Sequence, residues 1–143
     1  MKMFYGIILL LIVLASCTAT SNGIKATVYK SPSCGCCSLY ARELKTQGYD
    51  VNVVEVSDMS PIKNKYSIPS SMQTCHTTVI GDYYVEGHVP FAAVEKLLTE
   101  KPTIDGIALP GMPVGSPGMP GSKQGKFTIY AIKGSEKTAF MEI

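Results

Sequence analysis

Residues 24–56 read IKATVYKSPSCGCCSLYARELKTQGYDVNVVEV, and they carry the strongest fold signal in the chain. Residues 24–29 alternate in character and end in β-prone side chains, which predicts a strand. The Ser-Pro-Ser turn at 31–33 starts a helix that Gly48 ends, and the valine-rich segment 50–56 predicts a second strand. The apolar face of the helix has the spacing i, i+3, i+4 and i+7, formed by Cys37, Tyr40, Ala41 and Leu44. The stretch therefore predicts a strand–helix–strand unit with a cysteine cluster where the helix begins.

The chain from residue 60 onward predicts a second unit. Its predicted elements are a short helix over 60–66, a loop over 68–74, strands over 77–80 and 83–86, and a helix that starts at Pro90. The two strands turn at Gly81-Asp82, which is typical of a hairpin. The order β-α-β-α-β-β-α is that of the thioredoxin and glutaredoxin fold. We therefore predict an α/β protein with a thioredoxin-like βαβ–ββα core.

The composition changes after Lys101. Residues 107–121 contain four prolines, four glycines and two methionines, which excludes a helix and predicts a Pro/Gly/Met-rich loop. Residues 126–143 predict a C-terminal β-hairpin, and the loop is expected to link the core to it. Residues 24–143 are thus expected to form one domain.

The N-terminus predicts export and lipidation. Lys2 precedes an apolar run over residues 3–15, and a 13-residue helix of roughly 20 Å is too short to span a bilayer. The run ends in Leu14-Ala15-Ser16-Cys17, which resembles the lipobox of bacterial lipoproteins. We expect a signal peptide over 1–16, acylation of Cys17 and a tether over 17–23, with a plain signal peptide as the alternative. The protein would then lie at the extracytoplasmic face of a membrane, where disulfides are permitted.

Charge and composition exclude several function classes. Thirteen basic and eleven acidic residues give a net charge of +2, too little for a nucleic-acid partner. No glycine-rich phosphate loop precedes a helix, so a nucleotide is not expected. His76 and His88 are the only histidines, which excludes a His-rich zinc hydrolase site.

The segment Cys34-Gly35-Cys36-Cys37 contains the main candidate residues for catalysis or metal binding. A helix N-terminus stabilises thiolates, and these suit either attack on disulfides or metal binding. A dithiol catalyst would use Cys34 as nucleophile and Cys37 as resolving thiol, with no need for Cys36. Three clustered soft ligands suit Cu(I) or zinc. A structural disulfide with a spare thiol is the simplest alternative.

Cys75-His76 lies just before the third predicted strand, an edge that abuts the cysteine turn in a thioredoxin-like plan. Thioredoxins normally place a cis-proline there, whereas residues 74–80 contain no proline. We therefore predict Cys75 and His76 as ligands. His88 stands at a helix entrance, where it either binds the metal or caps the helix. Imidazole must be neutral to bind, so affinity is expected to fall below pH ~6.5.

Met112 and Met119 are weaker candidate ligands. They lie in near-repeated Pro-Gly-Met-Pro segments, and soft thioethers favour copper over zinc. The alternative is that they form a hydrophobic plug for the loop.

These motifs resemble those of the CopG-like family, bacterial envelope proteins encoded beside copper-resistance genes. The matching segments are 31–37, 75–79, 85–90, 110–113 and 115–119. The resemblance covers residues 24–119 and implies a thioredoxin-like fold, a copper cluster held by the cysteines, and a role in copper tolerance with thiol redox activity as an alternative. The pair Leu39-Tyr40 departs from the family, in which Trp is expected near the helix start.

We therefore predict a lipid-anchored envelope protein that binds more than one Cu(I) ion. The predicted ligands are Cys34, Cys36, Cys37, Cys75, His76 and His88, with Met112 and Met119 as weaker ones. Expected partners are the membrane, through the anchor, and other envelope copper-handling proteins. Two alternatives stay open: a thiol-disulfide oxidoreductase using Cys34 and Cys37, with or without coupling to copper redox chemistry, and a zinc module.

Overall fold

The computed structural model describes residues 23–143; the predicted signal peptide and the Cys17 acylation site lie outside the described residues. The strands are β1 (Lys25–Lys30), β2 (Asp50–Glu55), β3 (His76–Ile80), β4 (Tyr83–Glu86), β5 (Gly106–Ala108), β6 (Thr128–Lys133) and β7 (Glu136–Glu142). The helices are α1 (Gly35–Thr46), α2 (Ser60–Lys65) and α3 (Phe91–Glu100), with a 3-10 turn η1 at Ser70–Met72. In this part of the chain no helix is long and apolar enough to cross a membrane.

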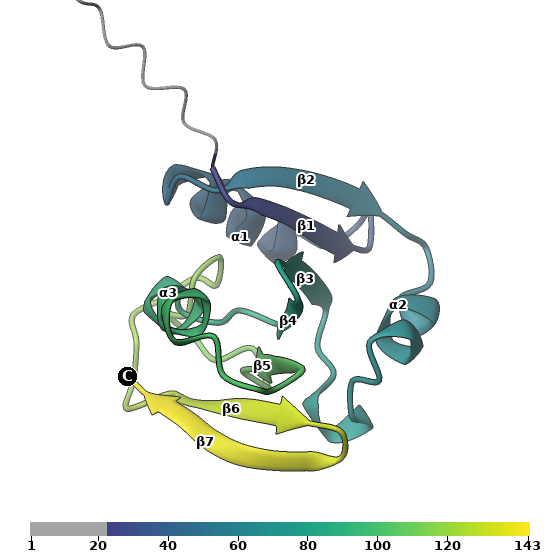
Figure 1. Ribbon diagram of the computed structural model, residues 1–143. Helices are drawn as coiled ribbons and strands as arrows, with labels where there is room; N and C mark the ends of the chain where they lie inside the picture. Colours follow the sequence, from purple (N-terminus) through teal and green to yellow (C-terminus); the bar gives the residue numbers. More distant parts are fainter. Residues whose placement is uncertain (1–22) are drawn as a thin grey trace, which may run out of the picture.

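The strands form one mixed sheet in the order β2-β1-β3-β4-β5-β6-β7 (Figure 1). β1 pairs parallel with β2 and antiparallel with β3, and β3 and β4 form an antiparallel hairpin. The predicted strand–helix–strand unit, the central hairpin and the C-terminal hairpin of β6 and β7 are confirmed. The α/β class is likewise confirmed.

β5 was not predicted, and it corrects the start of the loop. It pairs parallel with β4 and antiparallel with β6, so it joins the C-terminal hairpin to the rest of the sheet. The loop therefore begins at Leu109 rather than at Ile107. A Cβ at Gly106 would clash with the backbone oxygen and ring of Tyr84. A three-residue strand that is buried throughout shows no alternation, which is why its sequence resembled a loop.

Two apolar clusters cover the two faces of the sheet. The larger cluster contains the buried faces of α1 and α3 together with residues such as Val85 and Ile107. Their chain neighbours Tyr84 and Ala108 point to the opposite face, as alternation along a strand requires, and pack beside η1. Figure 1 accordingly shows α1 and α3 on one side of the strands and α2 on the other.

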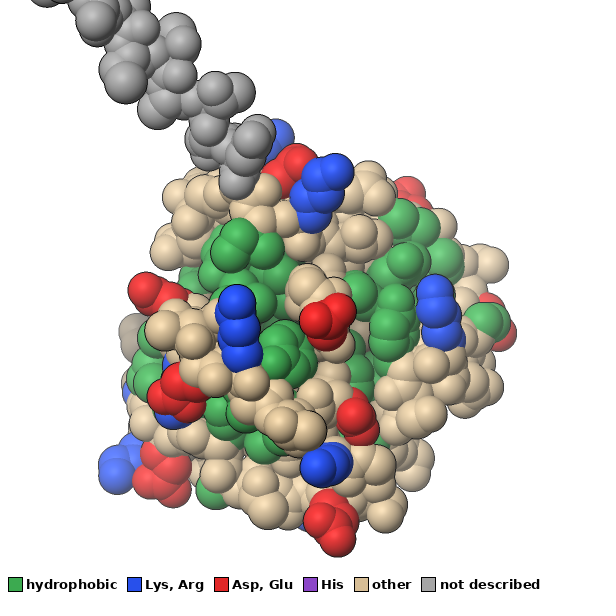
Figure 2. Space-filling view, viewed as in Figure 1, with side chains coloured by type: hydrophobic (Ala, Val, Ile, Leu, Met, Phe, Trp, Pro, Cys, Tyr) green, Lys and Arg blue, Asp and Glu red, His purple; other side chains and the backbone are tan. Residues whose placement is uncertain are grey.

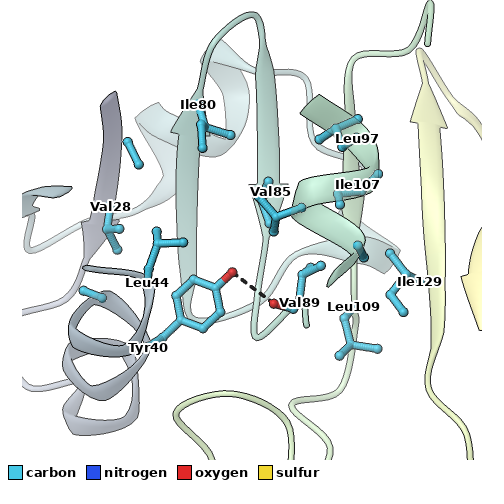
Figure 3. Close-up of a cluster of buried hydrophobic side chains, with 14 of the residues drawn as sticks. Val28, Tyr40, Leu44, Ile80, Val85, Val89, Leu97, Ile107, Leu109 and Ile129 are labelled. Carbon is cyan, nitrogen blue, oxygen red and sulfur yellow. Dashed lines mark hydrogen bonds between the residues drawn. The ribbon is translucent and has the colours of Figure 1, made fainter. Parts of the chain in front are cut away.

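One hydrogen bond ties α1 to the segment that precedes α3. The Tyr40 hydroxyl donates to the Val89 carbonyl at 3.1 Å (Figure 3). Both residues are buried in the larger cluster. The first turns of α1 are therefore fixed against the chain that carries His88.

Candidate metal centre

The cysteine turn lies at the N-terminus of α1. Cys34 is the N-cap residue, and Cys36 and Cys37 lie in the first turn. Cys37 is fully buried, as its place on the apolar face predicts, whereas Cys34 and Cys36 are half-buried. A disulfide joins Cys34 to Cys37, and the Sγ of free Cys36 lies 3.5 Å from that of Cys34.

Pairing of β1 with β3 brings the second motif to this turn. Lys30, at the end of β1, lies opposite His76, the first residue of β3. The thiol of the preceding Cys75 is free, and its Sγ lies 3.5 Å from His76 Nδ1 and 3.4 Å from His88 Nε2. The two imidazole rings meet edge to face, with centroids 4.8 Å apart.

Six of the predicted ligands form two overlapping groups of possible metal ligands. In each group all the ligand atoms lie within 4.8 Å of one another. The sulfur group consists of Cys34, Cys36, Cys37 and Cys75. The mixed group consists of Cys37, Cys75, His76 and His88. Because Cys37 and Cys75 belong to both, the two groups form one continuous cluster.

The donor set fits a soft metal ion. His76 Nε2 is buried and has no hydrogen-bond partner among residues 23–143, and an unsatisfied buried polar atom is costly. Both imidazoles are fully buried, and no histidine shows on the face drawn in Figure 2. Thiolate sulfur and imidazole nitrogen are ligands for Cu(I) and zinc.

Burial favours the neutral forms of these side chains. It lowers the pKa of His76 to about 3, and the neighbouring His88 and Lys63 contribute to that shift. Burial also lowers the pKa of His88, although the Pro117 carbonyl and Glu43 oppose that shift. The imidazoles therefore stay neutral below the pH of ~6.5 expected from the ordinary value.

Burial favours the neutral form of Cys75 as well, but for a thiol this means a raised pKa. Burial, and then the neighbouring Cys36, raise its pKa to about 11. A metal ion must therefore displace a proton from Cys75 at neutral pH, so competition with protons arises at the thiol rather than at the imidazoles.

The two methionines occupy different settings. Met112 exposes 39% of its surface and has a φ of +46°. Met119 is half-buried and follows Gly118, which packs on the first turns of α1. Their role as ligands stays a prediction.

Sequence reasoning missed a buried ion pair behind Cys75-His76. Lys63 Nζ donates to Glu86 Oε1 at 2.5 Å, and both side chains are buried. The same carboxylate accepts bonds from the backbone N–H of Thr74 and the hydroxyl of Thr77, which anchors the chain on both sides of Cys75. The one available signal was a charged residue, Glu86, within an otherwise buried strand.

Sequence reasoning also missed two contacts of the Pro/Gly/Met loop. His88 Nδ1 lies 2.7 Å from the Pro117 carbonyl oxygen. The backbone N–H of Gly118 donates to Glu43 Oε2 at 3.2 Å. The loop is thus more than a linker to the hairpin, because it contacts both α1 and an imidazole of the mixed group.

Comparisons with known proteins place the chain in a family. A family model described as "Protein of unknown function, DUF411" matches residues 72–119, which include Cys75-His76, His88 and both methionines. No curated protein matches the sequence. Two solved structures, forms 1 and 2 of copper resistance protein CopG, are each 37% identical, with a TM-score of 0.78. Each match covers 85% of this chain and 98% of the CopG chain. The chain therefore belongs to the CopG family.

Proposed function

We propose that this protein binds Cu(I) as its cargo, as more than one ion in a thiolate cluster, and serves copper tolerance in the bacterial envelope. The observation that carries the proposal is the overlap of the sulfur group and the mixed group at Cys37 and Cys75. The solved relatives are named copper resistance proteins, which supports copper as the metal.

The shared sulfurs favour a multinuclear cluster over a single ion. The cluster offers six side-chain ligands, more than the usual four of a tetrahedral sulfur and nitrogen site. A thiolate that bridges two ions lets Cys37 and Cys75 serve both groups. The neutral imidazoles of His76 and His88 complete the mixed group without adding negative charge.

The cluster can bind its full number of Cu(I) ions only after the Cys34–Cys37 disulfide is reduced. The Cys34–Cys37 bond removes two thiolates from the sulfur group. Two electrons and two protons from a thiol reductant convert it to two thiols, which then lose their protons to bind metal. The oxidised chain keeps a free thiol and two imidazoles in the mixed group, namely Cys75, His76 and His88.

We further propose that β1, α1, β2, β3, β4 and α3 form a thioredoxin-like core. The strand order β2-β1-β3-β4, with parallel β1 and β2 and antiparallel β3 and β4, supports it.

The lipid anchor at Cys17 and exchange of copper with other envelope proteins are part of the same proposal. A Cys17→Ala variant is expected to incorporate no labelled fatty acid, and an equally unlabelled parent protein would contradict the anchor.

A thiol-disulfide oxidoreductase is the second candidate, favoured by the Cys34–Cys37 disulfide at a helix start. In such a reaction the Cys34 thiolate attacks a substrate disulfide, and Cys37 resolves the mixed disulfide. With copper in place of a disulfide substrate, oxidation of the dithiol to the disulfide would instead pass its two electrons to two Cu(II) ions, giving two Cu(I), and release two protons to solvent. The two candidates can therefore share one site.

Metal analysis of protein purified without air from copper-supplemented cells tests the proposal. We expect more than one copper per chain and less copper in a Cys36→Ser variant, which keeps the Cys34–Cys37 pair. Disulfide-exchange activity in a protein that holds no copper would favour the oxidoreductase instead. Stoichiometric zinc without copper would favour the zinc module.

A further inference from the structure

A tight turn of the Pro/Gly/Met loop packs against the cysteine turn. Met119 N–H donates to the Ser116 carbonyl at 2.9 Å, and Gly118 has a φ of +77°. Proline at the second position and glycine with positive φ at the third are typical of a type II turn. A Cβ at Gly118 would lie 2.7 Å from both the Cys36 carbonyl oxygen and the Tyr40 nitrogen. Only glycine fits there.

The central peptide of this turn connects α1 to His88. Its carbonyl, from Pro117, lies 2.7 Å from His88 Nδ1. Its N–H, from Gly118, donates to Glu43 Oε2 on α1 at 3.2 Å. Because the C=O and N–H of a trans peptide point in opposite directions, one rigid unit contacts both groups.

These contacts decide which nitrogen of His88 carries a proton. A carbonyl oxygen can only accept, so Nδ1 must be the donor. The other nitrogen, Nε2, then carries the lone pair and faces the Cys75 thiol, with its Sγ 3.4 Å away. His76 has no comparable partner. No group in residues 23–143 forms a hydrogen bond with its Nε2.

We propose that Glu43 and the Ser116–Met119 turn are positioning groups that hold the His88 ring and commit its Nε2 to the metal. The inference rests on the proposed copper function. Partners of this kind, which bond the second nitrogen of a ligating histidine, orient the ring and determine which nitrogen faces the metal.

Gly118→Ala, with Gly125→Ala as its matched control, tests the turn. Both glycines have a φ of +77°, but beyond the adjacent residues no atom of the described chain lies within 4 Å of a Cβ at Gly125. The control therefore carries the same backbone strain without the contact against α1. Glu43→Ala removes the acceptor from an exposed position on α1, and Glu43→Gln keeps one.

The first measurement needs no copper. Long-range 1H–15N NMR of the reduced, metal-free protein reports which nitrogen of His88 is protonated. We expect the Nδ1–H form in the parent protein, Gly125→Ala and Glu43→Gln, and a mixture of both forms in Gly118→Ala. Parent protein with His88 protonated at Nε2 would overturn the inference, whatever the protein does with copper.

The second measurement is a Cu(I) competition titration. We expect affinity to fall roughly 10-fold or more in Gly118→Ala and about fivefold in Glu43→Ala, with parent values in the two controls. Copper binding by the parent with no loss in a folded Gly118→Ala would overturn the inference alone. If Gly118→Ala does not fold, equal affinity of Glu43→Ala and Glu43→Gln would overturn it. A parent protein that binds no copper would instead contradict the proposed function.

Discussion

The sulfur group and the mixed group differ in how they are held. Cys34 and Cys36 of the sulfur group are half-buried at the start of α1, and Cys34 is oxidised to a disulfide with Cys37. The imidazoles of the mixed group are fully buried, and His88 bonds to a fixed turn. The comparison indicates that the oxidation state of the cysteines controls metal binding by the sulfur group. In the mixed group, burial and the hydrogen bond to the turn fix the imidazoles before a metal binds.

The largest effect is expected where the two groups meet. Cys75→Ser removes a ligand from both groups without touching the disulfide. We expect Cu(I) affinity to fall by more than about 100-fold. This is a larger loss than that expected when a residue that only hydrogen-bonds to a metal ligand is removed. A Cu(I) competition titration measures it. Affinity like that of the parent protein would show that the groups do not share this sulfur.

A smaller effect is expected from Cys36→Ser, because Cys36 belongs to the sulfur group alone. The variant should bind less copper per chain and keep the affinity of the mixed group. It should also keep disulfide exchange through Cys34 and Cys37. Copper content equal to the parent's, together with abolished exchange, would assign Cys36 to thiol chemistry instead.

The last expected effect concerns a different quantity, the stability of the copper-free protein in acid. Burial lowers the pKa of His76 to about 3, so between pH ~6.5 and ~3 the unfolded chain binds one more proton there than the folded chain. The free energy of unfolding should therefore fall as pH falls, by about 1.4 kcal/mol per pH unit from this group. His76→Leu removes the contribution.

Urea unfolding between pH 7 and pH 4 measures this dependence. His88, whose pKa is also lowered, leaves a residual slope in the variant. The parent protein and His76→Leu losing stability with the same slope would contradict the buried neutral state of His76.

The sequence predicted those features that depend on local pattern. Spacing of apolar residues located α1, and the glycine turn located the β3–β4 hairpin. The Cys34–Cys37 and Cys75-His76 motifs pointed to residues that the structure brings together. For these features the local sequence pattern and the contacts in the folded chain point to the same structure.

Features that depend on contacts between distant segments were missed. The bond between His88 and Pro117 joins residues 29 positions apart, and neither residue type signals it. Lys63 is buried with its ammonium paired to Glu86, which lies 23 positions later in the chain. β5 forms because β4 and β6 flank it, not because its three residues favour a strand.

Anaerobic Cu(I) titration of the chain in two redox states is the sharpest test of the shared cluster. One sample carries the Cys34–Cys37 disulfide, and the other is fully reduced. We predict one Cu(I) per oxidised chain, bound by Cys75, His76 and His88, and more than one per reduced chain. An identical copper count in the two states would contradict the shared cluster.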